Sequence, residues 1–483
     1  MEYVSRTPLP GEVATDYGLL GGADAERGRK LFMTGSVLLA GALCYLAYKA
    51  SVDDPVHLVL GLLIFALAVL PSLLWARSGG SRFPVFETIL ILCANAYAMP
   101  VLNAHEQLVG YSAGVITQSC LAVIIYQLAA IATYQAVRGL PGRSPFWRDS
   151  LIDDKVEKFI VYGLILSTGY IAISTFTTWV PREVESILRA VFYGVGILCT
   201  FISSQRWGRG QLHQNEKVLF LCTLIPQLII MSIGLILIGA ISLIGIALLG
   251  YVSGGKRIPW LVMALTFLIF AVLHTGKTRM REKYWDQGLP APTISQLPSY
   301  FSEWADYGLQ PTSGGKTMSQ KMLERTSLMH ILCLIVDCTP ERQDYLYGKT
   351  YGYVLPQLIP RWFWPEKPRS HIATYELGIY YGLQRAEDTA TTTIAFGLVT
   401  EAYANFGMFG TMLLGAFWGF WLKKLQIWST FSPMFSFAGL LMVLLTAWAF
   451  SAELTMAAWV SSFQQAVIVV LGAPLLLRAL FGH

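Results

Sequence analysis

Charge is the first thing that this sequence has little of. Aspartate, glutamate, lysine and arginine make up 13% of the 483 residues, whereas hydrophobic residues make up 54%. The net charge of +5 is small for this length, and the cations stand mostly in short loops beside apolar runs. This distribution argues against a nucleic-acid partner and favours a chain that lies largely in a bilayer.

Motifs that identify an activity are also scarce. There is no HExxH helix, no GxxxxGK[ST] loop and no GxGxxG after a strand, and we expect no nucleophile elbow. These absences argue against a soluble nucleotide-dependent enzyme. Cysteine is equally uninformative, because five of the seven lie in apolar runs and no CxxC pair is present. We therefore expect neither a metal ion nor a cofactor.

Long apolar runs dominate what the sequence does contain. About 20 residues at 1.5 Å each cross a hydrocarbon core of about 30 Å. The chain is therefore expected to be an all-α polytopic integral membrane protein. Runs of suitable length are 31–48, 56–75, 84–102, 114–137, 159–180, 186–203, 258–275, roughly 393–422, 433–452 and 463–480.

One further run, 217–252, is too long for a single span and too short for two long ones. The alternation of cations decides between these readings, because short cytoplasmic loops are rich in Lys and Arg. Two spans meeting near Gly234 to Gly239 keep Lys256, Arg257, Lys423, Lys424 and Arg478 on the same side as the earlier cytoplasmic cations. This hairpin predicts about twelve transmembrane helices with both termini in the cytoplasm.

That topology divides the chain into four parts. Residues 1–30 form a cytoplasmic tail, 31–275 hold spans 1 to 9, 276–392 form one large extracytoplasmic loop, and 393–483 hold spans 10 to 12. Within the loop, the apolar runs 326–336 and 351–360 are too short to span. They are expected to be amphipathic or re-entrant pieces at the membrane surface.

Cations gather at the outer interface in this topology. Most of them have a simple explanation, because Arg and Lys near span ends snorkel to lipid headgroups. Arg361 differs, since Pro360 and Pro365 stiffen the segment LIPRWFWPEKPRS, 358–370, and a rigid frame suits a bidentate phosphate ligand. The outer cations are Arg182, Arg189, Arg279, Arg281, Arg325, Arg361, Lys367 and Arg369.

Glu401 is the most informative carboxylate. Counting about 20 residues back from Leu422 places it at the outer edge of the hydrocarbon, and Asn405 shares its helix face. A carboxylate at that depth is costly unless it is paired or functional. Arg and Lys can stabilise a diphosphate leaving group without metal, while a Glu can take a proton from a sugar hydroxyl. If Glu401 only neutralises an arginine, the next candidates for the base are His371, Glu376 and Asp337.

Three stretches in fixed order resemble the bacterial Wzy-type oligosaccharide repeat-unit polymerases of O-antigen and exopolysaccharide synthesis. They are ERTSLMHILCLIVDCTP (324–340), YGKTYGYVLPQLIPRWFWPEKP (347–368) and TEAYANFGMFG (400–410). The resemblance implies a GT-C-like membrane glycosyltransferase of the inner membrane with its site facing the periplasm. It also implies that Arg325, Arg361, Lys367, Glu401, Tyr403 and Asn405 line that site.

The implied reaction is metal-independent polymerisation of undecaprenyl-diphosphate-linked oligosaccharide units into O-antigen, capsule or exopolysaccharide. Glu401, Arg361 and Arg325 would be catalytic, and Arg279, Arg281 and Arg369 would join Lys367, Tyr403 and Asn405 in binding substrate. Expected partners are the lipid-linked donor and acceptor, membrane lipid, a chain-length co-polymerase and a flippase. The alternatives are an O-antigen ligase and a polysaccharide transporter or flippase.

Overall fold

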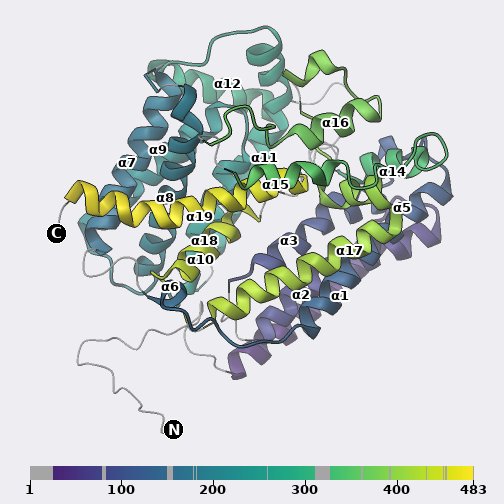
Figure 1. Ribbon diagram of the computed structural model, residues 1–483, viewed down its shortest axis with the longest axis horizontal. Coiled ribbons are helices and arrows are strands. Elements are labelled where there is room, and N and C mark those ends of the chain that lie inside the picture. Colours follow the sequence, from purple (N-terminus) through teal and green to yellow (C-terminus); the bar gives the residue numbers. More distant parts are fainter. Residues whose placement is uncertain are drawn as a thin grey trace.

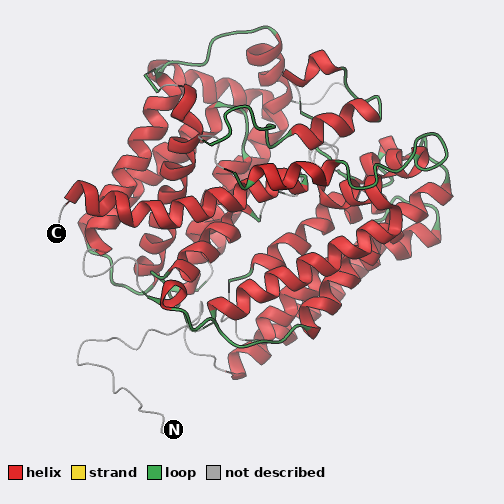
Figure 2. Cartoon of the chain, in the orientation of Figure 1, coloured by secondary structure: helices red, strands yellow, loops and turns green. Residues whose placement is uncertain are grey.

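Helices account for every regular element in the part of the chain that the computed structural model describes (Figure 2). The described residues are 25–78, 83–149, 156–177, 179–180, 182–257, 259–310, 327–359, 363–390, 393–430, 432–449, 451 and 454–481. The helices are α1 (Ala25–Lys49), α2 (Pro55–Arg77), α3 (Val85–Cys93), α4 (Met99–Leu102), α5 (Ala113–Ala136), α6 (Pro145–Arg148), α7 (Val156–Phe176), α8 (Arg182–Gly208), α9 (Gln214–Ile233), α10 (Ile238–Ser253), α11 (Trp260–Arg281), α12 (Leu297–Leu309), α14 (Met329–Cys338), α15 (Val354–Gln357), α16 (Ile372–Tyr380), α17 (Gly397–Ser429), α18 (Phe437–Trp448) and α19 (Met456–Phe481).

Eight stretches of these helices are long and apolar enough to cross a membrane. They confirm the polytopic all-helical character that the apolar runs predict, because an isolated segment in lipid must satisfy its backbone within a helix. The outward faces of α1 and α11 expose large apolar side chains, among them Val37, Leu38 and Leu261. The stretches are Gly28–Lys49, Pro55–Arg77, Val85–Leu102, Ala113–Ala136, Glu157–Phe176, Leu188–Gly208, Gln214–Ile233 and Trp260–Trp285.

The ambiguous run 217–252 folds as two helices, as the hairpin interpretation predicts. Helix α9 ends at Ile233 and α10 begins at Ile238, and Leu235 between them has a φ of 55°. With 16 residues α10 is shorter than a typical span, and α18 has only 12. The direction in which each helix crosses a bilayer stays a prediction.

The helices form two groups with α18 and α19 between them (Figure 1). One group contains α1, α2, α3, α5 and α17, and the other contains α7 to α12. In the first group α17 crosses α5 closely, since a Cβ added at Gly415 would lie 2.2 Å from the Tyr126 carbonyl oxygen. Gly419 approaches the Ala130 carbonyl oxygen in the same way, so the two glycines form a small-residue contact typical of membrane helices.

The segment expected to be a loop, 276–392, is helical at its start. Helix α11 continues to Arg281, and a π turn extends it to Asp286. Further on, α14 is enclosed by protein, with Met329 and Leu332 fully buried, and it packs against α5 and α17. Enclosure favours the re-entrant alternative for this piece over an amphipathic helix on the surface. In α15 and just beyond it, by contrast, Leu355 and Leu358 are exposed.

Candidate functional site

Helix α17 is broken directly after Asn405. Phe406 has φ −144° and ψ 18°, and Gly407 has φ 59° and ψ −145°. A break frees backbone carbonyl groups in the turn before it, and buried carbonyls need donors. Leu346 N–H donates to the Ala404 carbonyl (3.0 Å) and Tyr347 N–H to the Asn405 carbonyl (3.1 Å). The 346–350 segment thus closes the broken end.

Replacing Gly407 by Ala is predicted to destabilise the protein. A residue with a side chain in this φ and ψ region, which is essentially restricted to glycine, costs about 1–3 kcal/mol, and the added Cβ would lie 2.8 Å from the Tyr345 hydroxyl oxygen. Thermal unfolding of the purified protein measures the loss. Gly41→Ala on α1 is the matched control, since its Cβ meets nothing within 4 Å and Ala is the better helix former. Equal melting temperatures for the two variants would contradict the strained break.

Asn405 is the polar centre of this junction. Its side-chain oxygen accepts from Gly348 N–H (3.0 Å), and its amide donates to the Thr350 hydroxyl (2.8 Å) and the Glu401 carbonyl (2.8 Å). The residue is fully buried. With these bonds made inside the protein, Asn405 positions the 346–350 segment on α17.

Glu401 is also fully buried, and one carboxylate oxygen, Oε2, accepts from the backbone N–H of Met456 at 2.6 Å. Met456 is the first residue of α19, so the carboxylate caps the positive N-terminal end of that helix from another helix. The other oxygen, Oε1, accepts no hydrogen bond in good geometry within the described chain, although Thr350 lies beside the carboxylate. No ion pair joins Glu401 to a described cation. Because Glu401 is fully buried, a sugar cannot contact it directly in this structure.

Tyr403 faces a different neighbour. Its hydroxyl accepts from Gln118 of α5 at 2.7 Å, and its side chain is fully buried. In the motif TEAYAN, Glu401, Tyr403 and Asn405 therefore contact α19, α5 and the 346–350 segment, respectively.

A second polar cluster involves Lys349 of this same segment. The Lys349 ammonium forms an ion pair with Glu376 of α16, and the Tyr353 hydroxyl lies beside the same carboxylate. The hydrogen bond to Glu376 raises the pKa of Lys349, and it raises the pKa of Tyr353 as well. Tyr353 belongs to the 3₁₀ turn η5 (Thr350–Tyr353), next to the contact of Thr350 with Asn405.

The aromatic and cationic segment 358–370 is held at its base by Lys367. The ammonium is buried and donates to the carbonyls of Ile359 (2.7 Å) and Gln357 (3.4 Å). Gln464 of α19 donates to the Leu358 carbonyl (2.9 Å), which ties the segment to α19. Arg369 is exposed. Arg361 and Arg325 lie outside the described residues, as does the Arg182 side chain.

Arg279 and Arg281 lie on the last turn of α11. Arg279 donates to the Gln310 side chain and stands 5.8 Å from the Tyr307 ring centre. Arg281 donates to the Leu235 carbonyl (3.0 Å) in the α9–α10 turn and stacks 4.1 Å over Trp285. The structure therefore places these two arginines at α11 and the α9–α10 turn, apart from the contacts of Asn405 and Glu401.

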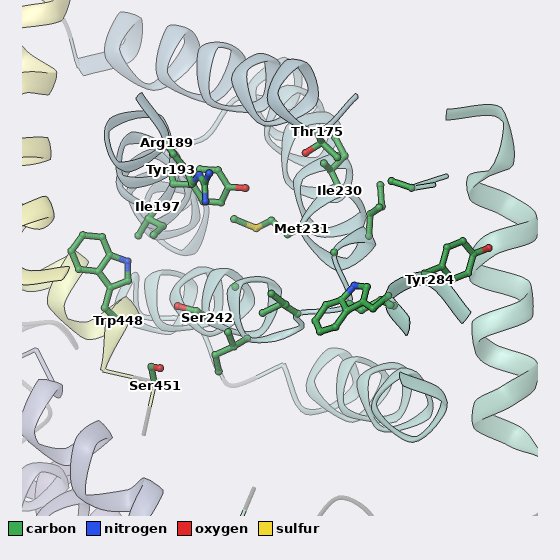
Figure 3. Close-up of a pocket in the computed structure, with 18 of the residues that line it drawn as sticks. Thr175, Arg189, Tyr193, Ile197, Ile230, Met231, Ser242, Tyr284, Trp448 and Ser451 are labelled. Carbon is green, nitrogen blue, oxygen red and sulfur yellow. The ribbon is translucent and has the colours of Figure 1, made fainter. Parts of the chain in front are cut away.

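A cavity of about 720 Å³ opens beside that turn (Figure 3). Its walls are mainly apolar and come from α7 to α10, the 284–300 region and the α18–α19 connection. Arg189 and Tyr193 of α8 lie near Met231 on one side, and Trp448 and Ser451 lie on another. Ile236, Ile238 and Trp285 on its wall are exposed, so the cavity is open to the surroundings.

The cavity and the Glu401 junction share the start of α19. Leu454 and Ser462 line the cavity, whereas Met456 binds Glu401. Sequence reasoning missed this cavity and the capping contact. Gly234 and Gly239, whose missing side chains leave open space, were the one available signal for the cavity.

The stretch GYSAG, 110–114, has the letters of a nucleophile elbow, contrary to our expectation of none. The structure gives Ser112 another role, because its hydroxyl accepts from Val115 N–H (3.3 Å) as the N-cap of α5. An elbow requires a strand before the serine, and no strand occurs among the described residues. In the same part of the chain no three His, Cys, Asp or Glu residues lie close enough together to hold a metal ion.

The class of molecule is thus an all-helical protein with several candidate membrane spans and a polar junction beside an open apolar cavity. Residues 212–429 match the model of a family described as a domain of unknown function, DUF8712. That match begins just before α9 and ends with α17. No curated protein matches the chain, and no solved structure matches it.

Proposed function

We propose that this protein is a metal-independent membrane glycosyltransferase that polymerises undecaprenyl-diphosphate-linked oligosaccharide units on the extracytoplasmic side of the inner membrane. The observation that carries the proposal is the open apolar cavity with Arg189 on its wall, next to the α17–α19 junction. A lipid carrier with an anionic head needs both features, an apolar wall for its chain and a cation for its head.

The hydrophobic effect does not drive a carrier chain from the bilayer into the cavity, so the gain in free energy must have another source. Lipid tails are as apolar as a cavity wall, so a chain that moves from bilayer to protein gains packing contacts and charge pairing. A cavity of about 720 Å³ accommodates part of a long isoprenoid chain. Arg189 already pairs with Glu185, and a diphosphate would compete with that carboxylate for the guanidinium.

Besides Arg189, we assign the diphosphate to the cations of the 358–370 segment and its neighbours. Arg361 and Arg325 would bind phosphate oxygens bidentately, and Arg369 would add charge at the surface. Lys367 anchors the base of the segment through two carbonyl groups. In this arrangement Lys367 positions the other cations, and its remaining charge adds to the field at the leaving group.

The reaction forms a bond between an acceptor hydroxyl oxygen and the anomeric carbon of the donor sugar. The bond from that carbon to the diphosphate oxygen breaks, and its electron pair leaves with the undecaprenyl diphosphate. The acceptor proton passes to a protein base. The arginines stabilise the charge that develops on the leaving group.

The broken helix does not favour a transporter. In transporters, unwound backbone carbonyls at a break bind ions or substrate. Here the carbonyls of Ala404 and Asn405 accept hydrogen bonds from the 346–347 backbone. The break serves to attach a segment of the protein itself.

Deletion of the gene tests the proposal through the surface glycan that remains. We expect chains of a single repeat unit, restored to full length by a plasmid copy. Complete loss of the glycan would instead indicate a ligase or a flippase, and an unchanged length distribution would overturn the assignment.

A further inference from the structure

Glu376 and Lys349 form an ion pair that is partly accessible. The Glu376 side chain is 16% exposed and the Lys349 side chain 61% exposed. One carboxylate oxygen, Oε1, meets the ammonium, whereas Oε2 is itself buried and has no hydrogen-bond partner in good geometry among the described residues. An exposed lysine therefore covers Oε1 of a carboxylate whose buried Oε2 keeps free acceptor capacity.

The two carboxylates of this region differ in access. Glu401 is 0% exposed and binds the N-terminus of α19. Reaching it would require α17 and α19 to separate, whereas reaching Glu376 requires one exposed lysine side chain to move. A base must come within about 3 Å of the hydroxyl that it deprotonates.

The surroundings of Glu376 are held in place from several sides. Thr374 of the same helix meets Thr455 at the start of α19 (3.4 Å). Gln343 donates to the Tyr380 carbonyl (2.7 Å), and the Tyr380 hydroxyl donates to the Asp344 carbonyl (3.0 Å). These bonds fix α16 against the segment that carries Lys349, so the carboxylate has a rigid base.

We propose that Glu376 is the residue that takes the proton from the acceptor sugar hydroxyl once Lys349 has moved off Oε1, and that Tyr353 orients its carboxylate. The inference rests on the proposed glycosyl transfer. The acceptor oxygen bonds to the anomeric carbon, its proton goes to a Glu376 oxygen, and the diphosphate leaves with the bonding electrons. Glu376 then returns the proton to water.

The test uses full-length protein in vesicles with a synthetic undecaprenyl-diphosphate oligosaccharide as donor and acceptor. Glu376→Gln keeps the size of the side chain but cannot take a proton, so elongation should fall at least about 100-fold. Glu303→Gln is the matched control, because Glu303 is also a partly exposed carboxylate paired with a lysine, Lys283, and it lies outside this cluster. It should elongate like the wild type.

A charge swap distinguishes a catalytic role of Glu376 from a purely structural ion pair with Lys349. The double variant Lys349→Glu, Glu376→Lys rebuilds the pair with its carboxylate on the other segment. It should melt near the wild-type temperature and still fail to elongate. Recovery of elongation in the swap, or normal elongation by Glu376→Gln, would overturn the role of Glu376 alone. An inactive wild-type protein would overturn the glycosyl transfer itself, and this inference with it.

Discussion

The Gly239→Trp substitution is expected to leave the protein folded and to reduce polymer formation at least about tenfold, which corresponds to about 1.4 kcal/mol in donor binding. Gly239 lies in the first turn of α10 and lines the cavity. A Cβ added there meets nothing within 4 Å, so the indole can project into open space. The donor chain would lose the packing contacts that this space offers, and packing is what holds a lipid chain against a membrane protein.

Gly41→Trp supplies the control for this substitution. Gly41 is exposed on α1, and an added Cβ there also meets nothing within 4 Å. Both variants carry the same new side chain on an apolar helix, and only one places it in the cavity. Donor binding and chain length would be measured in one vesicle preparation, with melting temperature as the check on folding. Equal polymer from both variants would remove the cavity from the reaction.

The fold could be predicted from sequence wherever local composition determines it. Apolar run length predicted the helices, and the alternation of Arg and Lys predicted that 217–252 splits into two. The structure places that split at 234–237, inside the expected interval. Neither prediction depends on which helices contact each other, so each can be made from a single sequence.

Contacts between distant segments could not be predicted in this way. The pairing of Leu346 and Tyr347 with the end of the first part of α17 depends on backbone groups, which every residue carries. Gly407 tolerates the positive φ at the break, but a glycine in the sequence does not show what fills that break. The buried position of Lys367 could not be predicted either, because its partners are backbone carbonyl groups, which every residue carries.

The expected depth of Glu401 in the membrane was not enough to predict its partner. Counting residues placed the carboxylate near the end of a span, and its cost in an apolar setting implied a partner. The partner is the backbone N–H of Met456, 55 residues further along the chain. Pairing with an arginine was the alternative to a catalytic role, and helix ends, which also attract carboxylates, are not evident from composition.

Two variants at Glu401 are expected to separate capping from proton transfer. Glu401→Gln keeps a side-chain oxygen that can accept from Met456 N–H, so the protein should be made at nearly normal abundance and should still polymerise. Glu401→Leu has a similar volume and no acceptor. It leaves a buried N–H without a partner, which costs about 1–3 kcal/mol, and it should lower the melting temperature and the membrane abundance together.

The reasoning behind this pair is that capping needs only an acceptor, whereas a general base needs a titratable one. A helix start without its cap loses about 0.5–2 kcal/mol of stability, and such losses reduce the steady-state amount of a protein in cells several-fold. Polymer per molecule of protein is therefore the deciding quantity, measured with abundance in one membrane preparation. If Glu401→Gln is abundant but makes only single repeat units, Glu401 is the base, and the capping contact is secondary. If Glu401→Leu is scarce while Glu401→Gln polymerises normally, the carboxylate holds α19 on α17, and the proton must go to a more accessible group.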